Sequence, residues 1–169
     1  LAMTATSACS VALGGSLPRL FNERRLPLIR SGAVLFALTI GLLLAAVLGD
    51  APGWVFPAGY VLLAASGIGL PSNTSVMREL SRPGTVAMNL SVLNGLSYVA
   101  CGTVGQIGGL ILDQFRAAAR KTVSGTVVYP KEAYAAFFAF LAVLAAVNLL
   151  SAWRIPETGG IRQNRGQDT

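Results

Sequence analysis

The side chains best suited to hold a small molecule lie between Pro83 and Asp113, a stretch without any Asp, Glu, Lys or Arg between its ends. Asn94 and Tyr98 stand one helical turn apart there, so a helix would present both on one side. Ser66 has a similar place near the middle of residues 54–77. Amide and hydroxyl groups donate and accept hydrogen bonds without a charge. We therefore predict that these three residues hydrogen-bond to a substrate; hydrogen bonds to a neighbouring helix are the alternative.

Other kinds of site chemistry are poorly supported. The chain has no histidine, which removes imidazole metal ligands and histidine-based acid–base catalysis. Cys9 and Cys101 lie in apolar runs without CxxC spacing and are interpreted as small hydrophobic residues. No pairing of a nucleophile with a base stands out in the sequence. We expect a protein that is not an enzyme and that needs no cofactor and no metal.

The composition places these residues in a membrane protein. Of the 169 residues, 53% are hydrophobic and only 12% are charged, and the mean hydropathy is +0.62. Soluble domains carry about 25% charged residues, so the difference is large. The net charge of +6 is spread over short connectors instead of one basic patch. We therefore expect a lipid bilayer, and no nucleic acid, as the partner of this surface.

The apolar runs predict an all-α fold, a polytopic membrane helix bundle. A helix needs roughly 20 apolar residues to cross the hydrocarbon core. Five runs are candidates, residues 1–17, 31–48, 54–77, 85–112 and 133–153, and together they form one domain over residues 1–153. The first run is the shortest, and we interpret it as the inner part of a helix in a longer chain. The polar tail, residues 154–169, is predicted to be disordered.

Glycines in the fourth run recur at helical spacing. Small residues let helices approach closely in lipid, so we predict that four glycines pack against a neighbouring helix: Gly95, Gly102, Gly105 and Gly109. Asn148, in the fifth run, is interpreted as a packing amide, and Asn73 as a helix-ending or gating residue.

The basic residues predict an orientation. Connectors 18–30 and 78–83 and the tail from Arg154 carry nine of the thirteen Lys and Arg residues and should share one side of the membrane. Connectors 49–53 and 113–131 should share the other side. By the positive-inside rule the first group, and with it the carboxy terminus, is cytoplasmic. We expect a multi-pass protein of the cell membrane, either an inner or a plasma membrane.

Three short stretches resemble the major facilitator superfamily of transporters. In that family a cytoplasmic loop follows the pattern G-x-L-x-D-R-x-G-R-R, and here Gly15 to Arg25 reads GSLPRLFNERR. Gly15, Leu17, Arg24 and Arg25 match, whereas Arg19 takes the acidic position and Asn22 that of the second glycine. The other two stretches are Arg78-Glu79 followed by Pro83-Gly84-Thr85, and the ending Pro156-Glu157-Thr158.

The resemblance implies the eighth to twelfth spans of a twelve-helix transporter, with the amino-terminal half of the same protein as the missing partner. It also implies secondary active transport of a small-molecule substrate by alternating access. Gly15, Arg24 and Arg25 would then belong to a cytoplasmic gating loop, although a topology signal in contact with lipid headgroups explains the two arginines as well. The alternative function is a small non-transporting membrane scaffold or assembly protein.

Overall fold

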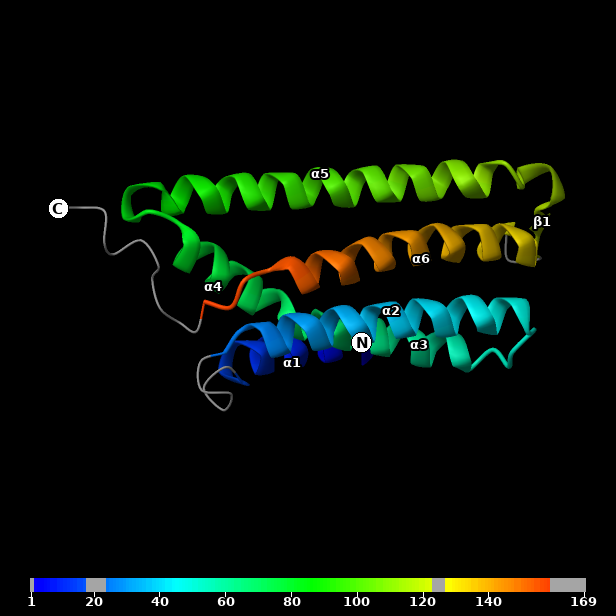
Figure 1. The fold of residues 1–169 in the computed structure, drawn as a ribbon. Coiled ribbons are helices and arrows are strands. Elements are labelled where there is room, and N and C mark those ends of the chain that lie inside the picture. Colours follow the sequence, from blue (N-terminus) through cyan, green and yellow to red (C-terminus); the bar gives the residue numbers. More distant parts are fainter. Residues whose placement is uncertain (1, 18–23, 123–126, 159–169) are drawn as a thin grey trace.

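The computed structural model describes residues 2–17, 24–122 and 127–158, and these form an all-α bundle of elongated helices (Figure 1). The order of elements is α1 (Ala2–Ser16), α2 (Leu26–Leu48), α3 (Val55–Ala65), the 3₁₀ helix η2 (Ser66–Gly69), α4 (Leu70–Leu80), η3 (Pro83–Thr85), α5 (Val86–Asp113), η4 (Arg116–Ala118), β1 (Arg120–Lys121), β2 (Val127–Val128) and α6 (Lys131–Arg154). The two short strands pair antiparallel in the connector between α5 and α6.

Four helical segments in the described part of the chain are long and apolar enough to cross a membrane: Leu26–Leu48, Val55–Leu80, Pro83–Asp113 and Lys131–Arg154. The predicted fold class is therefore confirmed. The first predicted span forms α1, whose 15 residues rise about 22 Å at 1.5 Å per residue. That length is shorter than the roughly 30 Å hydrocarbon core.

Two boundaries differ from the sequence prediction. Helix α2 begins at Leu26 instead of residue 31, with Pro27 in its first turn, where the missing N–H is tolerated. Residues 154–158 were assigned to the disordered tail, but Arg154 ends α6 and Thr158 is buried. The rest of the tail, residues 159–169, and residues 18–23 of the predicted gating loop lie outside the described residues.

The third span is interrupted near its middle. Helix α3 gives way to the 3₁₀ helix η2, and α4 then continues to Leu80. Pro71 lies in the first turn of α4 and has no N–H to donate to the carbonyl four residues before it, Gly67. A proline at this position explains why regular α-helical bonding is lost just before it.

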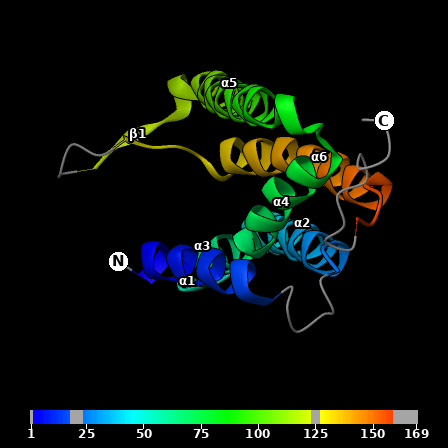
Figure 2. The same ribbon diagram turned by 90° about the vertical axis from the view of Figure 1, so that its left-hand side faces the viewer.

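Helix α2 is central to the bundle. It packs along α6 on one side and along α3 and η2 on the other, while α1 packs against α3, η2 and α4 (Figure 2). Two hydrophobic clusters fill these contacts, one around Leu43, Val47 and Phe138 and one around Ile29, Ala33, Val76 and Ala152. Helix α5 lies at the edge of the bundle, against α6 and α4, and is largely exposed (Figures 1 and 2).

The tight glycine contacts are not on α5's predicted stripe. A Cβ atom added at Gly95, Gly102, Gly105 or Gly109 would meet nothing within 4 Å among the described residues. By contrast, a Cβ at Gly14 would clash with the Ile68 carbonyl oxygen, one at Gly32 would lie 2.8 Å from the Ser66 carbonyl oxygen, and one at Gly69 would lie 3.0 Å from that of Leu28. Glycine is required where α1 and α2 meet the backbone of η2. The packing of Gly95, Gly102, Gly105 and Gly109 against another helix stays a prediction, and that helix would have to come from outside the described residues.

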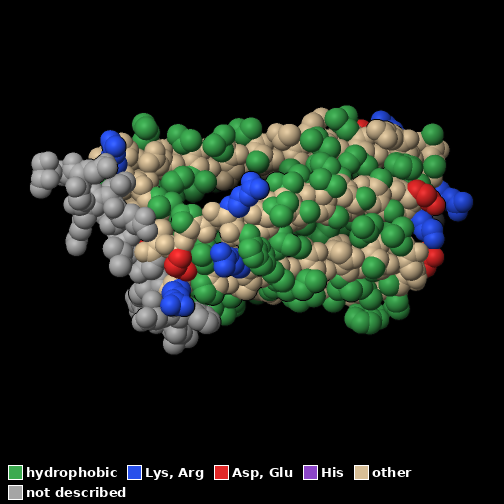
Figure 3. Space-filling view, viewed as in Figure 1, with side chains coloured by type: hydrophobic (Ala, Val, Ile, Leu, Met, Phe, Trp, Pro, Cys, Tyr) green, Lys and Arg blue, Asp and Glu red, His purple; other side chains and the backbone are tan. Residues whose placement is uncertain are grey.

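The charged connectors gather at opposite ends of the bundle. Hydrophobic side chains run along the helices on the face drawn in Figure 3, and acidic side chains lie toward the two ends. Arg25, Glu79 and Thr158 meet at one end, and Asp50 and Lys131 meet at the other. The described parts of the connectors thus lie at two ends, as the predicted grouping expects, and the assignment of these ends to two sides of a membrane stays a prediction.

Candidate functional site

A polar cavity lies beside the interruption of the third span. Its volume is about 400 Å³, and its walls come from α1, α2, α3, η2, α4 and α6. The polar side chains that line it are Ser7, Ser66, Asn73, Asn148 and Ser151. The remaining walls are mostly small or apolar, including Gly32, Gly67 and Gly69. Polar side chains on membrane-spanning helices are uncommon without a function, so this cavity is the first candidate site.

Two glycines line this cavity where α2 and η2 come into close backbone contact. Gly32 on α2 and Gly69 on η2 bring the two backbones together, so that no side chain stands between the helices at this level. The Ser66 hydroxyl donates a hydrogen bond of 2.7 Å to the Leu63 carbonyl, within its own turn. That bond leaves the Ser66 oxygen available only as an acceptor for a ligand. Asn73 and Asn148 have exposed side chains, and their amide groups can both donate and accept hydrogen bonds.

A second cavity of about 520 Å³ adjoins the first between α4, α5 and α6. Asn73, Ser151 and Ile155 line both cavities, so the two are neighbours. Leu93 is the residue of α5 that lines the second cavity, and Arg154 and Pro156 close it toward the end of α6. Its walls are more apolar than those of the first cavity, which makes the first the better site for hydrogen bonding.

The predicted ligand residues are separated by the fold. Ser66 lines the polar cavity, whereas Asn94 and Tyr98 on α5 are exposed, and 80% of the Tyr98 side chain is accessible. Asn94 follows Leu93, and adjacent residues of a helix point about 100° apart, so Asn94 does not line the neighbouring cavity. A ligand that bound Asn94 and Tyr98 would need a second wall from outside the described residues.

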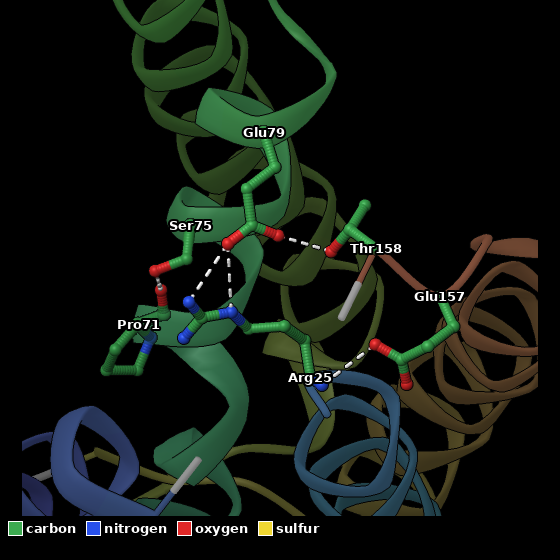
Figure 4. Close-up of polar contacts among 6 residues, drawn as sticks. All are labelled: Arg25, Pro71, Ser75, Glu79, Glu157 and Thr158. Carbon is green, nitrogen blue, oxygen red and sulfur yellow. Dashed lines mark hydrogen bonds and ion pairs between the residues drawn. The ribbon is translucent and has the colours of Figure 1, made fainter. Parts of the chain in front are cut away.

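One end of the bundle is held by an ion pair between α2 and α4. The Arg25 guanidinium donates two hydrogen bonds to Glu79 Oε1, from Nε at 3.2 Å and from Nη2 at 2.9 Å (Figure 4). The two side chains are only 16% and 12% exposed. Ile29 and Asn73 line the polar cavity. Arg25 lies one turn before Ile29, and Glu79 lies six residues after Asn73. The ion pair therefore stands at the end of the bundle nearest to the cavity.

The segment after α6 completes this contact. Thr158 Oγ1 donates a hydrogen bond to Glu79 Oε2, and the backbone N–H of Arg25 donates to the Glu157 carboxylate at 3.0 Å (Figure 4). The same carboxylate accepts the backbone N–H of Leu26 at 3.2 Å. The first N–H groups of a helix lack partners inside the helix and favour a negative charge nearby. Glu157 thus caps α2. We call the four residues Arg25, Glu79, Glu157 and Thr158 the terminal clamp.

The terminal clamp contains one of the three predicted gating residues. Arg25 pairs with a carboxylate, while its gating role stays a prediction. Arg24 is exposed, and a Cβ at Gly15 would meet nothing within 4 Å. Sequence reasoning overlooked Glu79, Glu157 and Thr158 as site residues. The signal that could have indicated Glu79 is that it is the single acid of connector 78–83, on the side of the membrane rich in arginine.

Asn73 and Asn148 also gain a role that their sequence positions did not indicate. Both were interpreted as structural or gating residues, yet both line the polar cavity together with Ser66.

Comparisons of the chain with known protein families, with curated proteins and with solved structures found no match.

Proposed function

We propose that this chain is the carboxy-terminal part of a secondary transporter that resembles the major facilitator superfamily. It would move a small solute across an inner or plasma membrane by alternating access, together with an amino-terminal half. The four membrane-spanning helices and the three sequence stretches that resemble this family support the proposal.

The observation that carries the proposal is the polar cavity at the interrupted third span. Secondary transporters bind substrate near the middle of the membrane, often where a helix is broken. Here η2 breaks the span, and Ser66, Asn73 and Asn148 supply neutral hydrogen-bonding groups beside the break. The combination suits an uncharged, polar part of a solute better than an ion, because none of the described residues that line the cavity is Asp, Glu, Lys or Arg.

The exposed face of α5 has a place in the same proposal. Asn94 and Tyr98 would face the amino-terminal half across the transport pathway, and the glycine stripe would let helices of that half approach closely. Large apolar side chains of α5 that are also exposed, among them Met88, Leu96 and Val99, would be covered by lipid or by the same partner.

The terminal clamp would act as the cytoplasmic latch of this half. It ties together α2, α4 and the segment after α6, all at the arginine-rich end. By the positive-inside rule this end, and the carboxy terminus, face the cytoplasm. Opening of the pathway on that side would require α2 and α4 to separate, and the Arg25–Glu79 pair opposes that movement.

Transport by the complete gene product in proteoliposomes tests the proposal, with a panel of neutral and charged solutes. We expect uptake of at least one solute, and an Asn148→Ala variant whose KM rises about two- to tenfold, the range of one lost hydrogen bond. Thr103→Ala is the matched control, because the exposed Thr103 hydroxyl donates to the Val99 carbonyl of its own helix and Thr103 projects about 180° from Asn94.

Two further variants separate the two parts of the site. Asn94→Ala and Tyr98→Phe should impair transport if α5 contributes to the pathway, and unchanged transport in both would remove α5 from it. A complete protein that moves none of the solutes, yet binds a partner membrane protein, would favour the scaffold function instead.

A further inference from the structure

A third, chemically different cavity lies at the end of the bundle opposite the terminal clamp. Its volume is about 480 Å³, within the range of roughly 300–1,000 Å³ that small-molecule sites occupy. Four of its nine lining residues are aromatic: Phe56, Tyr60, Tyr134 and Phe138. Aromatic residues make up only 8% of the whole chain, so they are strongly concentrated here. The cavity is formed by α2, α3 and α6 and shares no lining residue with the two cavities near the terminal clamp.

The walls of this cavity are held in place by the core. Phe138 is buried and packs with Leu43 and Val47, and Phe56 and Tyr134 pack against the same cluster. These rings are therefore ordered by contacts behind them and do not need a ligand to position them. Preformed walls reduce the entropy lost when a ligand binds.

The charged groups that line the cavity are Asp50 and Lys131. Lys131 Nζ donates hydrogen bonds of 3.1 and 2.9 Å to the two carboxylate oxygens of Asp50, and both side chains are more than half exposed. The ammonium group of Lys131 is thus already hydrogen-bonded to a carboxylate that lines an aromatic cavity. Aromatic rings attract cations through their negative faces, and pockets of several rings recognise organic ammonium groups.

The backbone of Asp50 gives a second indication. Asp50 has a φ of 49°, just after Gly49 ends α2, and the Ala51 N–H donates to the Ala46 carbonyl. This bond is the one that usually follows a glycine in the left-handed conformation at the end of a helix. Aspartate is strained at this position relative to glycine. The strained conformation keeps a carboxylate beside the cavity where glycine would supply none.

We propose that the aromatic cavity of Phe56, Tyr60, Tyr134 and Phe138 binds an organic ammonium cation, with Asp50 as its counter-ion and Lys131 as a built-in competitor for that carboxylate. The cation would enter between the rings while Lys131 Nζ moves away from Asp50 into solvent. The site does not depend on the proposed transport function. Two sources of this chemistry exist, a free quaternary ammonium compound and the choline headgroup of a phospholipid.

If Lys131 competes for Asp50, then removing the charge of Lys131 and removing that of Asp50 should change the affinity for choline in opposite directions. Calorimetric titration of the purified protein in a non-ionic detergent and an amine-free buffer would use choline and its uncharged isostere, 3,3-dimethylbutan-1-ol. We expect choline to bind and the isostere to bind at least about tenfold more weakly. Lys131→Ala should strengthen choline binding about three- to tenfold, and Asp50→Asn should weaken it by a similar factor.

Matched variants control for general charge effects. Lys121→Ala and Asp113→Asn remove exposed charges near the same end of the bundle and should leave choline binding unchanged. Tyr60→Phe keeps the ring and should bind choline, whereas Tyr60→Leu should not. Equal binding of the isostere, or weaker choline binding by Lys131→Ala in a protein with unchanged helical content, would overturn the proposal.

Nanodiscs identify the source of the cation. Discs of phosphatidylcholine should suppress choline binding relative to discs of phosphatidylglycerol if lipid headgroups fill the site. Equal choline binding in both would assign the site to free compounds, and either result supports an ammonium site. Failure to bind choline in both kinds of disc and in detergent would overturn it, whatever the outcome of the transport assay.

Discussion

Breaking the ion pair between Arg25 and Glu79 should measurably destabilise the bundle. Both hydrogen bonds from Arg25 reach the same oxygen of Glu79, and Thr158 bonds to the other. Hydrogen bonds to charged groups contribute about 1.5–3 kcal/mol, whereas exposed ion pairs contribute only about 0.2–1 kcal/mol. With side chains 16% and 12% exposed, this pair belongs between these ranges. We expect a coupling free energy of about 1–1.5 kcal/mol.

A double-mutant cycle with Arg25→Met and Glu79→Gln measures that coupling. The readout is the free energy of unfolding of the purified protein in mixed micelles with increasing denaturing detergent. Arg24→Met is the control, because Arg24 is the neighbouring arginine and is exposed; its effect should stay within about 0.5 kcal/mol. A coupling below about 0.5 kcal/mol, the additivity expected for independent sites, would refute the terminal clamp as a stabilising contact.

Three further predictions concern other parts of the bundle. Gly32→Ala should reduce the free energy of unfolding by about 1–3 kcal/mol, because its Cβ would lie 2.8 Å from the Ser66 carbonyl oxygen, whereas Gly102→Ala should not; equal effects would contradict the close contact at η2. Glu157→Gln removes the charge that caps α2 and should reduce that free energy by about 0.3–1 kcal/mol, a loss that 1 M salt should diminish in the same unfolding assay. Cys101 in a Cys9→Ser background should react with a water-soluble methanethiosulfonate in the assembled protein if α5 lines an aqueous pathway, and mass spectrometry would detect the adduct; absence of reaction would place this stripe against lipid or another helix.

The spans could be predicted from the sequence because their signal is local. A run such as residues 31–48 is apolar on every side, and its composition alone requires a helix in a bilayer. The end of such a run is less well determined, because a helix can continue into polar sequence when its terminus finds partners. Helix α2 does so from Leu26, where Glu157 accepts the N–H groups that water would otherwise satisfy.

The terminal clamp could not be predicted in the same way. It joins Arg25 to Glu79 and Glu79 to Thr158, and each of these pairs is separated by more than fifty positions in the chain. Such contacts depend on how α2, α4 and α6 are packed, and composition does not encode that packing. The polar sequence after Arg154 was assigned to disorder for this reason, although two of its side chains have buried or partly buried partners.

The glycines likewise show that a sequence pattern can define one face of a helix without indicating what packs against that face. Periodicity correctly groups Gly95, Gly102 and Gly109 near one side of α5, but it cannot determine whether that side meets another helix. Among the described residues this side is open, and the close contacts with the backbone of another element lie at Gly14, Gly32 and Gly69, around a 3₁₀ turn that interrupts the helical period. The free carbonyl groups of a broken helix must be covered by protein or water instead of lipid, and a glycine lets a neighbouring helix come close enough to cover them. Glycine opposite the break is therefore a stronger indication of packing than a glycine stripe, and here it also marks the polar cavity.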